Sequence, residues 1–162
     1  GLTPVKLFHK GYYDHMEESH ELLAFYGNEK IWDILAENPR NRVVVFGEQP
    51  EMLRFPCSTQ SYTDIEGSGG NFNLSSSPEA LADFFTFAGV DYIYLGSGYL
   101  KPGTDGFRNV TGLLKQGYLS DLLYENGNGL AVFSSDPKNL TEEESEALLA
   151  EFTEKYWPGE QQ

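Results

Sequence analysis

The pattern of apolar and polar residues predicts a helix followed directly by a strand at the centre of the chain, over residues 77–96. Ser77 and Pro78 predict the helix start, because the serine hydroxyl can accept from free first-turn amides and proline lacks a donor that has no partner there. Gly89 predicts the helix end, since glycine adopts the left-handed conformation at low cost. An aromatic and β-branched run over 91–95 then predicts a strand. The apolar helix face, at i, i+3, i+4 and i+7, consists of Leu81, Phe84, Phe85 and Ala88.

The strongest strand signal is the run Val-Val-Val-Phe at residues 43–46. An unbroken apolar run predicts burial of both strand faces, as in a parallel sheet covered by helices. A short helix capped by Asn28 is expected before this strand. After it we expect a helical turn over 49–53 and a weaker strand over 54–58 that contains Pro56.

The C-terminal third predicts a short helix over 110–116 and then a β-hairpin. The hairpin strands are expected over 119–124 and 129–134, because the Asn-Gly pair at 126–127 accepts the positive φ angles of a tight turn.

A final acidic helix is predicted over 141–157, where Thr141 and Glu144 have the spacing of a capping box. Its expected buried stripe consists of Leu148, Leu149, Phe152 and Tyr156.

Together these elements predict an α/β fold. We expect a three-layer sandwich with a mostly parallel sheet, an antiparallel C-terminal hairpin at its edge and a final amphipathic helix. The chain contains no visible internal repeat or domain boundary, so we expect one domain over 1–162 with a helical lead-in over 1–40.

The charge of the chain narrows its partners. Its 162 residues carry a formal net charge of −14 and a pI near 4.4, which argues against binding to nucleic acid or to an anionic membrane surface. Solubility is the plainer interpretation of this charge, and attraction of basic partners is the alternative. No stretch has the 18 or more apolar residues of a membrane span. The chain begins Gly1-Leu2 without methionine, which we expect of a piece of a longer protein whose targeting or membrane segments lie outside it.

No catalytic arrangement is recognisable in the sequence. Cys57 has no histidine in its segment to act as a base, and the Gly-x-Ser-x-Gly nucleophile motif is missing. The histidines lie among acidic residues near the start, which favours a solvated acidic helix over a metal site, since the last two are five residues apart and do not share a helix face. They are His9, His15 and His20. The sequence therefore predicts no cofactor and no metal ion.

A ligand cleft is conceivable beyond the carboxyl ends of the strands, where open α/β sheets bind their ligands. Acidic and aromatic residues after the first and central strands, and in the loop between them, would suit a sugar, although ordinary loop residues remain the alternative. The candidate ligand-binding residues are Glu48, Gln49, Tyr62, Asp64, Glu66 and Tyr99.

Three segments also carry a resemblance to a known family. They are NRVVVFGEQPEMLRFPCSTQSY (41–62), PEALADFFTFAGVDYIYLGSGYL (78–100) and LLKQGYLSDLLYENGNGLAVFS (113–134). Together they resemble the extracytoplasmic soluble region that follows the transmembrane helices of bacterial polytopic glycosyltransferases, of the dolichyl-phosphate-mannose-protein mannosyltransferase-like kind. The resemblance covers roughly residues 30–134 and is carried mostly by fold-forming residues.

The resemblance implies a non-catalytic accessory domain on the extracytoplasmic side of a bacterial cell membrane. Its partner would be the transmembrane portion of its own parent chain, where the catalytic acidic residues of such enzymes lie, so no catalytic residue carries over to this chain. The alternative is a carbohydrate or small-molecule binding module that uses the cleft at the strand ends. A hydrolytic enzyme is the least supported reading, because no nucleophile, base and orienting residue converge in the sequence.

Overall fold

The computed structural model describes residues 27–47, 50–66 and 74–156. In chain order the elements are α2 (Glu29–Ala36), β1 (Arg42–Phe46), the 3₁₀ helix η1 (Pro50–Leu53), β2 (Ser58–Ser61), α3 (Tyr62–Glu66), α4 (Pro78–Ala88), β3 (Tyr92–Leu95), α5 (Asp105–Lys115), β4 (Leu119–Glu125), β5 (Asn128–Phe133) and α6 (Glu142–Tyr156).

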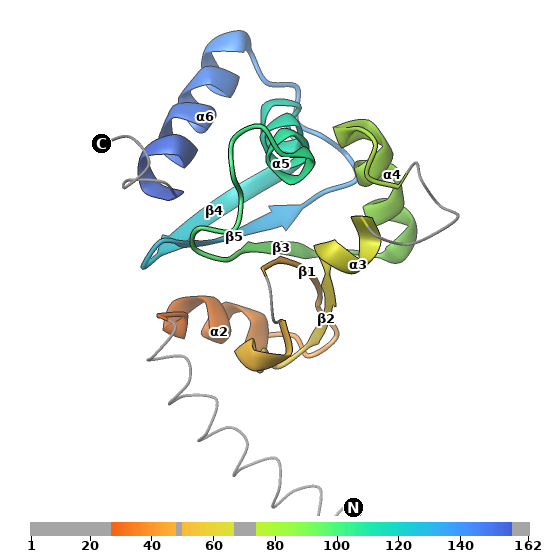
Figure 1. Ribbon diagram of the computed structural model, residues 1–162, viewed down its shortest axis with the longest axis vertical. Helices are drawn as coiled ribbons and strands as arrows, with labels where there is room; N and C mark the ends of the chain where they lie inside the picture. Colours follow the sequence, from red (N-terminus) through yellow and green to blue (C-terminus); the bar gives the residue numbers. More distant parts are fainter. Residues whose placement is uncertain (1–26, 48–49, 67–73, 157–162) are drawn as a thin grey trace, which may run out of the picture.

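The five strands form one sheet in the order β2-β1-β3-β5-β4. β1 is parallel to both β2 and β3, whereas β5 is antiparallel to β3 and to β4. Four strands therefore point one way and only β5 is reversed. In Figure 1 helices α3, α4, α5 and α6 lie over one face of the sheet, and α2 with η1 lies under the other. The predicted three-layer α/β sandwich with a hairpin edge is confirmed.

β1 explains why the sheet needs both helical layers. Val44 and Phe46 point into the core beneath α4, α5 and α6, whereas Val43 and Val45 pack into a second core with α2. All four side chains are at most 2% exposed. The continuous apolar run is thus the sequence signature of a strand buried on both faces.

The central helix and strand form as predicted. The Ser77 hydroxyl accepts from the backbone N–H of Ala80 at 3.1 Å, and Gly89 ends α4 with φ 70°. The backbone N–H of Val90 then donates to the Phe85 carbonyl at 3.0 Å, which closes the helix end. β3 follows directly and pairs in parallel with β1, as expected.

The weak strand expected over 54–58 is wrong, because β2 begins only at Ser58. Arg54 has a left-handed φ of 51° and Pro56 follows it, so this stretch turns instead of extending. Pairing starts where the Ser58 N–H donates to the Asn41 carbonyl at 3.2 Å. β2 is consequently a short polar strand at one edge of the sheet.

The helix expected over 110–116 in fact begins at Asp105. The Thr104 hydroxyl accepts from the Phe107 N–H at 3.3 Å and caps its first turn. Gly106 lies within this helix and is buried there. A Cβ there would lie 3.3 Å from Leu100 and 3.4 Å from Tyr62, so close packing explains the small residue.

The final helix starts with the predicted capping box. The Glu144 N–H donates to the Thr141 hydroxyl at 3.1 Å, and the Glu144 carboxylate accepts from the Thr141 N–H at 2.9 Å. Phe152 and Tyr156 are buried as expected, whereas Leu148 and Leu149 are only half-buried. No described helix is long and apolar enough to cross a bilayer.

Three phenylalanines of α4 provide a graded test of the core. Phe85 is fully buried with its ring against Phe133, Phe84 is half-buried rather than enclosed as expected, and Phe87 is 89% exposed. Phe85→Ala is expected to lower the free energy of unfolding by about 3–5 kcal/mol, because it leaves a cavity. Phe84→Ala should cost less, and Phe87→Ala about 0.5 kcal/mol or less. Urea denaturation measures all three, and equal losses at Phe85 and Phe87 would contradict the packing described here.

Candidate functional site

The carboxyl ends of the parallel strands define the edge of the sheet where a ligand is expected. We call this the carboxyl edge. Because β5 runs antiparallel to β3, its first residues lie beside the last of β3, with Leu95 opposite Gly129. In Figure 1 the β4–β5 turn, the start of α2 and the end of α6 all lie at this end of the strands, although α2 and α6 cover opposite faces of the sheet. The start of α2 and the end of α6 therefore both lie near the predicted site.

A buried hydrogen-bonded chain joins three elements at the carboxyl edge. The Asn28 side-chain amide donates to the Tyr94 hydroxyl at 2.8 Å and its oxygen accepts from Asn128 at 2.9 Å. The Asn128 side-chain oxygen in turn accepts from the Ser97 N–H at 2.8 Å. Asn28 is 0% and Asn128 5% exposed, so these bonds are shielded from water. The Asn28 side chain does not cap α2 as expected, because these buried partners engage it.

The first turn of α2 is capped from the hairpin instead. The Glu125 carboxylate accepts from the N–H of Lys30 at 3.0 and 3.1 Å and from that of Ile31 at 3.1 Å. A negative charge at this place also complements the helix dipole. The Asn126 side chain donates to the Gly27 carbonyl at 3.1 Å. We call these contacts, between residues 27–31 and the turn 125–128, the entry clamp.

Gly27 is required by the clamp. It has φ 73°, and a Cβ at this position would lie 2.6 Å from the Asn126 side-chain nitrogen. Any other residue would therefore be strained and would push the two segments apart.

The structure does not bring all of the predicted ligand-binding residues together at one site. Glu48 and Gln49 lie outside the described residues. Tyr62 is 1% exposed, its ring stacks on Phe46 at 4.3 Å between centroids, and its hydroxyl accepts from Asn109 at 3.1 Å. A ring enclosed in this way serves the core and offers no surface to a sugar.

Asp64 and Glu66 are exposed, and the structure places them on the helix α3 rather than in a loop as expected. The hydroxyl groups of Tyr99 and Thr63 lie 2.8 Å apart, so the loop after β3 contacts α3. The structure thus brings Tyr99 together with the segment that carries Asp64 and Glu66. Whether a ligand binds there stays a prediction.

The end of α6 fixes the same loop. The Tyr156 hydroxyl donates to the Gly96 carbonyl and accepts from the Leu100 N–H at 3.4 Å. The Phe152 ring stacks on that of Tyr156, with centroids 5.1 Å apart. Sequence reasoning assigned Tyr156 only to an apolar stripe, because nothing in a helical pattern indicates where a terminal hydroxyl points.

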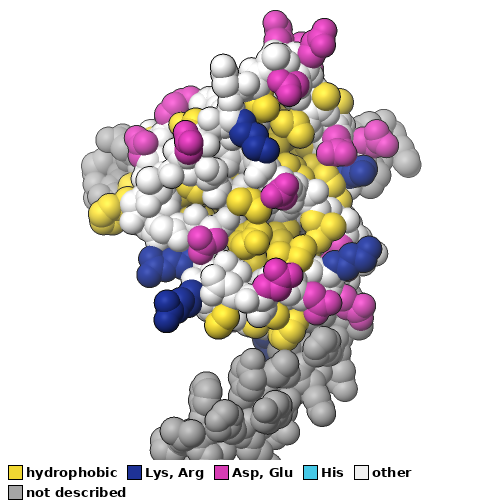
Figure 2. Space-filling view, turned by 180° about the vertical axis from the view of Figure 1, so that it is seen from behind, with side chains coloured by type: hydrophobic (Ala, Val, Ile, Leu, Met, Phe, Trp, Pro, Cys, Tyr) yellow, Lys and Arg dark blue, Asp and Glu magenta, His cyan; other side chains and the backbone are white. Residues whose placement is uncertain are grey.

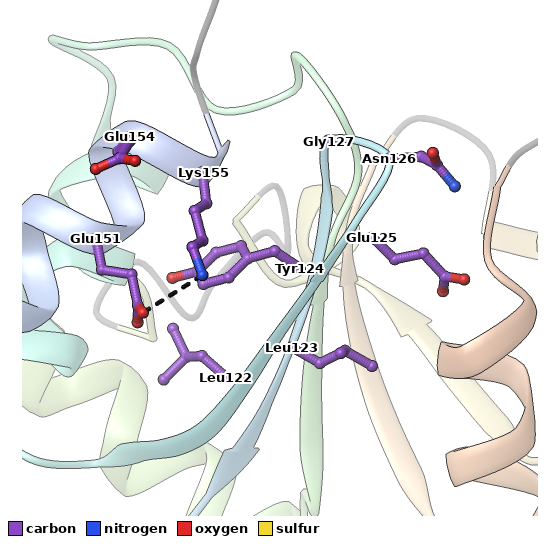
Figure 3. Close-up of a pocket in the computed structure, with 9 residues that line it drawn as sticks. All are labelled: Leu122, Leu123, Tyr124, Glu125, Asn126, Gly127, Glu151, Glu154 and Lys155. Carbon is purple, nitrogen blue, oxygen red and sulfur yellow. Dashed lines mark ion pairs between the residues drawn. The ribbon is translucent and has the colours of Figure 1, made fainter.

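A second concave site lies beside β4 and is drawn in Figure 3. This groove, of about 500 Å³, is lined by Leu122, Leu123, Tyr124, Glu125, Asn126, Gly127, Glu151, Glu154 and Lys155. The Lys155 ammonium lies 3.6 Å from the Glu151 carboxylate and 5.9 Å from the centroid of the Tyr124 ring. Burial, and the nearby charge of Glu151, raise the pKa of Tyr124, so this phenol stays protonated at neutral pH. We call this site the β4 groove.

Nucleophilic and metal chemistry find little support in the described part of the chain. Burial, together with the charge of Asp91, raises the pKa of Cys57 to about 11, which keeps it a thiol at neutral pH and a weak nucleophile. The described residues contain no cluster of three or more side chains suited to a metal ion. All three histidines lie outside the described residues.

No protein-family model, curated protein or solved structure matches this chain.

The buried asparagines can be tested with a double-mutant cycle. Asn128→Ala leaves the Asn28 oxygen and the Ser97 N–H without this partner, so we expect a loss of about 2–4 kcal/mol in the free energy of unfolding. Asn28→Ala should cost a similar amount. Because the two side chains share a bond, the double variant should lose about 1–2 kcal/mol less than the sum. Additive losses would contradict a direct bond between them.

The buried tyrosines predict a loss of stability in alkali. Burial raises the pKa of Tyr62, Tyr94 and Tyr156 to about 12, from about 10 in the unfolded chain. A raised folded pKa means that the folded state holds its protons longer, so this stabilisation is complete below pH 10 and is lost as the pH rises from 10 to 12. We expect the free energy of unfolding to fall across that window. Absorbance at the tyrosinate band should rise in two phases for the folded chain and in one for the chain in denaturant.

Proposed function

We propose that this chain is a non-catalytic, extracytoplasmic accessory domain of a membrane-bound glycosyltransferase-like protein. The segments at 41–62, 78–100 and 113–134 support the proposal through their resemblance to such regions. The entry clamp is the observation that carries it. A domain that assists an active site elsewhere in its parent must be held in a fixed orientation to the segment that joins them, and the clamp holds residues 27–31, where such a segment would enter, against the sheet.

The clamp fixes the entering chain in three ways. The Asn28 side chain is buried in the hydrogen-bonded chain to Tyr94 and Asn128, Glu125 caps the first turn of α2, and Gly27 is packed against Asn126. Each contact joins the entering chain to the β4–β5 turn or the end of β3. The direction of the chain at Gly27 is therefore coupled to the sheet itself.

The placement of the acidic residues favours an accessory role over catalysis. Glycosyl transfer and hydrolysis need two carboxylates held at a set separation around the reacting bond. Asp64 and Glu66 both lie on α3, two residues apart. Residues two apart on a helix point in nearly opposite directions, so these carboxylates do not converge on one substrate atom.

Carbohydrate binding at the carboxyl edge is a second candidate. The bond between Tyr99 and Thr63 places a half-buried phenol ring beside the helix that carries the exposed carboxylates. Rings and carboxylates are the groups with which proteins stack against sugars and accept from their hydroxyls. Ligand-observed NMR against a sugar panel tests this candidate, and Tyr99→Ala should abolish the signal.

The accessory proposal predicts that the isolated chain does not turn over nucleotide sugars, polyprenyl-phosphate sugars or simple glycosides. The reason is that Asp64 and Glu66, the described acidic pair at the predicted cleft, do not converge on one substrate atom. Assays of the purified chain measure this directly. Turnover that disappears in Asp64→Asn or Glu66→Gln would overturn the proposal in favour of an enzyme.

The companion experiment uses the full-length parent protein. Asn128→Ala, which removes the Asn28–Asn128 bond of the clamp, should lower its rate of glycosyl transfer while the isolated variant chain still folds by circular dichroism. Asp136→Ala is the matched control, because Asp136 is exposed and lies after β5, outside the clamp. An unchanged transfer rate with a broken clamp would show that fixation at this junction is not needed.

A further inference from the structure

β4 leaves one edge of the sheet open among the described residues. It is the last strand in the order β2-β1-β3-β5-β4 and pairs with β5 alone. The two-residue turn makes Glu125 and Asn128 a hydrogen-bonded pair. Because pairs alternate along an antiparallel ladder, the backbone N–H and C=O of Tyr124 point away from β5. They are available to a further strand.

The side chains around this edge are apolar. Leu122 and Tyr124 are half-buried against the core beneath α6, and Leu123 is half-buried on the opposite face, against the core that includes Ile31 of α2. Figure 2 shows apolar side chains gathered in a stripe over this region, with acidic side chains around it. The opposite edge differs, since β2 consists of Ser58, Thr59, Gln60 and Ser61.

The charges around the β4 groove select among possible occupants. The carboxylates of Glu151 and Glu154 line it together with one ammonium, of Lys155, whereas the Glu125 carboxylate is turned to the first turn of α2. Figure 3 shows Lys155 directed to Glu151, with Glu154 on the neighbouring turn of α6. A second copy of this chain would bring the same acidic rim and a net charge of −14, so it would be repelled. A basic partner would be attracted.

A bulge restricts where a strand can be added. Asp121 has φ 49°, and the register with β5 shifts between Ser120 and Leu123. Bulges and exposed charges on edge strands prevent unselective pairing. The bulge leaves residues 123–125, with Leu122 directly before them, as the regularly paired stretch of the edge.

We propose that the β4 groove binds an extended peptide segment with alternating basic and apolar side chains, which adds to the sheet beside residues 122–125. The peptide backbone bonds to the outward N–H and C=O of Tyr124. Its basic side chains lie on the α6 face, where they pair with Glu151 and Glu154 beside Tyr124, and its apolar side chains lie on the opposite face, where they cover Leu123. This inference is independent of the accessory role proposed above.

The test uses the 162-residue chain and fluorescein-labelled peptides of about nine residues, the length of a long strand. A peptide of alternating lysine and valine is expected to bind, and one of alternating glutamate and valine is not. Binding is measured by fluorescence polarisation, and ¹⁵N NMR shifts should concentrate on residues 122–125. Methylation of alternate backbone nitrogens in the peptide should abolish binding, because it removes the donors that a strand needs.

A charge variant tests the specificity. Glu151→Gln with Glu154→Gln should weaken binding of the lysine peptide about tenfold at low salt, since two attractive contacts are lost. Glu142→Gln with Glu143→Gln is the matched control, because it removes the same charge at the opposite end of α6. All four side chains are exposed, so the fold should persist.

Four outcomes would overturn the proposal. They are no binding of the lysine peptide at millimolar concentration, equal binding of the glutamate peptide, shifts that map to β2 instead of β4, and unchanged binding of the methylated peptide. A concentration-dependent dimer that is lost in the Glu151 and Glu154 variant would instead assign the groove to a second copy of this chain.

Discussion

Burial of both faces of β1 is the constraint on which the rest of the structure depends. Val43 and Val45 need a cover on one side of the sheet, and Val44 and Phe46 need one on the other. Burying one such side chain contributes about 1.5–3 kcal/mol, and ordering the backbone of one residue costs about 1–2 kcal/mol. With one cover missing, two of the four side chains would stay in water, and burial of the other two would not exceed the cost of ordering all four. The two helical layers follow from this requirement. Among the described residues they leave the strand ends and the two outer strands as the parts of the sheet that a partner could reach.

At the carboxyl edge the buried side chains are polar rather than apolar. Asn28, Tyr94 and Asn128 lie where the apolar layers end, and each hydrogen bond between them compensates for burial of an amide or a hydroxyl. A buried amide without a partner costs about 1–3 kcal/mol, so these groups specify one position for α2 relative to the hairpin. Apolar contact alone would hold α2 against the sheet but would not set its direction. The polar chain therefore determines the direction of α2.

The sequence predicted the elements that rest on local chemistry and missed the contacts between distant segments. The cap at Ser77, the left-handed Gly89, the Asn126-Gly127 turn and the capping box at Thr141 all involve neighbours in the chain, and all four form as predicted. Failures came where a tertiary contact changed a local preference. Gly106 lies inside α5, where Leu100 and Tyr62 leave room only for a small residue, and the Asn28 side chain points to Tyr94 instead of its own helix.

The candidate site shows the same limit. Tyr62 was expected at the ligand cleft as part of the loop between the first and central strands, and it lies directly after β2, at the start of α3. Its orientation into the core depends on Phe46 and Asn109, which no sequence spacing connects to it. Asn128 follows the Asn126-Gly127 turn motif, which accounted for this stretch of the sequence, so nothing indicated a separate role for its side chain. A sequence pattern locates the end of a strand but does not determine which side of the strand end a side chain occupies.

The two outer strands extend this argument from the fold to function. β2 and β4 are both edges of one sheet, yet β2 is polar and four residues long, whereas β4 has seven residues with leucines and a tyrosine and a bulge at Asp121. Edge strands that only need to stay unpaired are made short and polar, as β2 is. The apolar side chains of β4 would lower solubility without benefit if that edge were always exposed. Its composition is explained if a partner covers it, with the acidic rim and the bulge deciding which partner can do so.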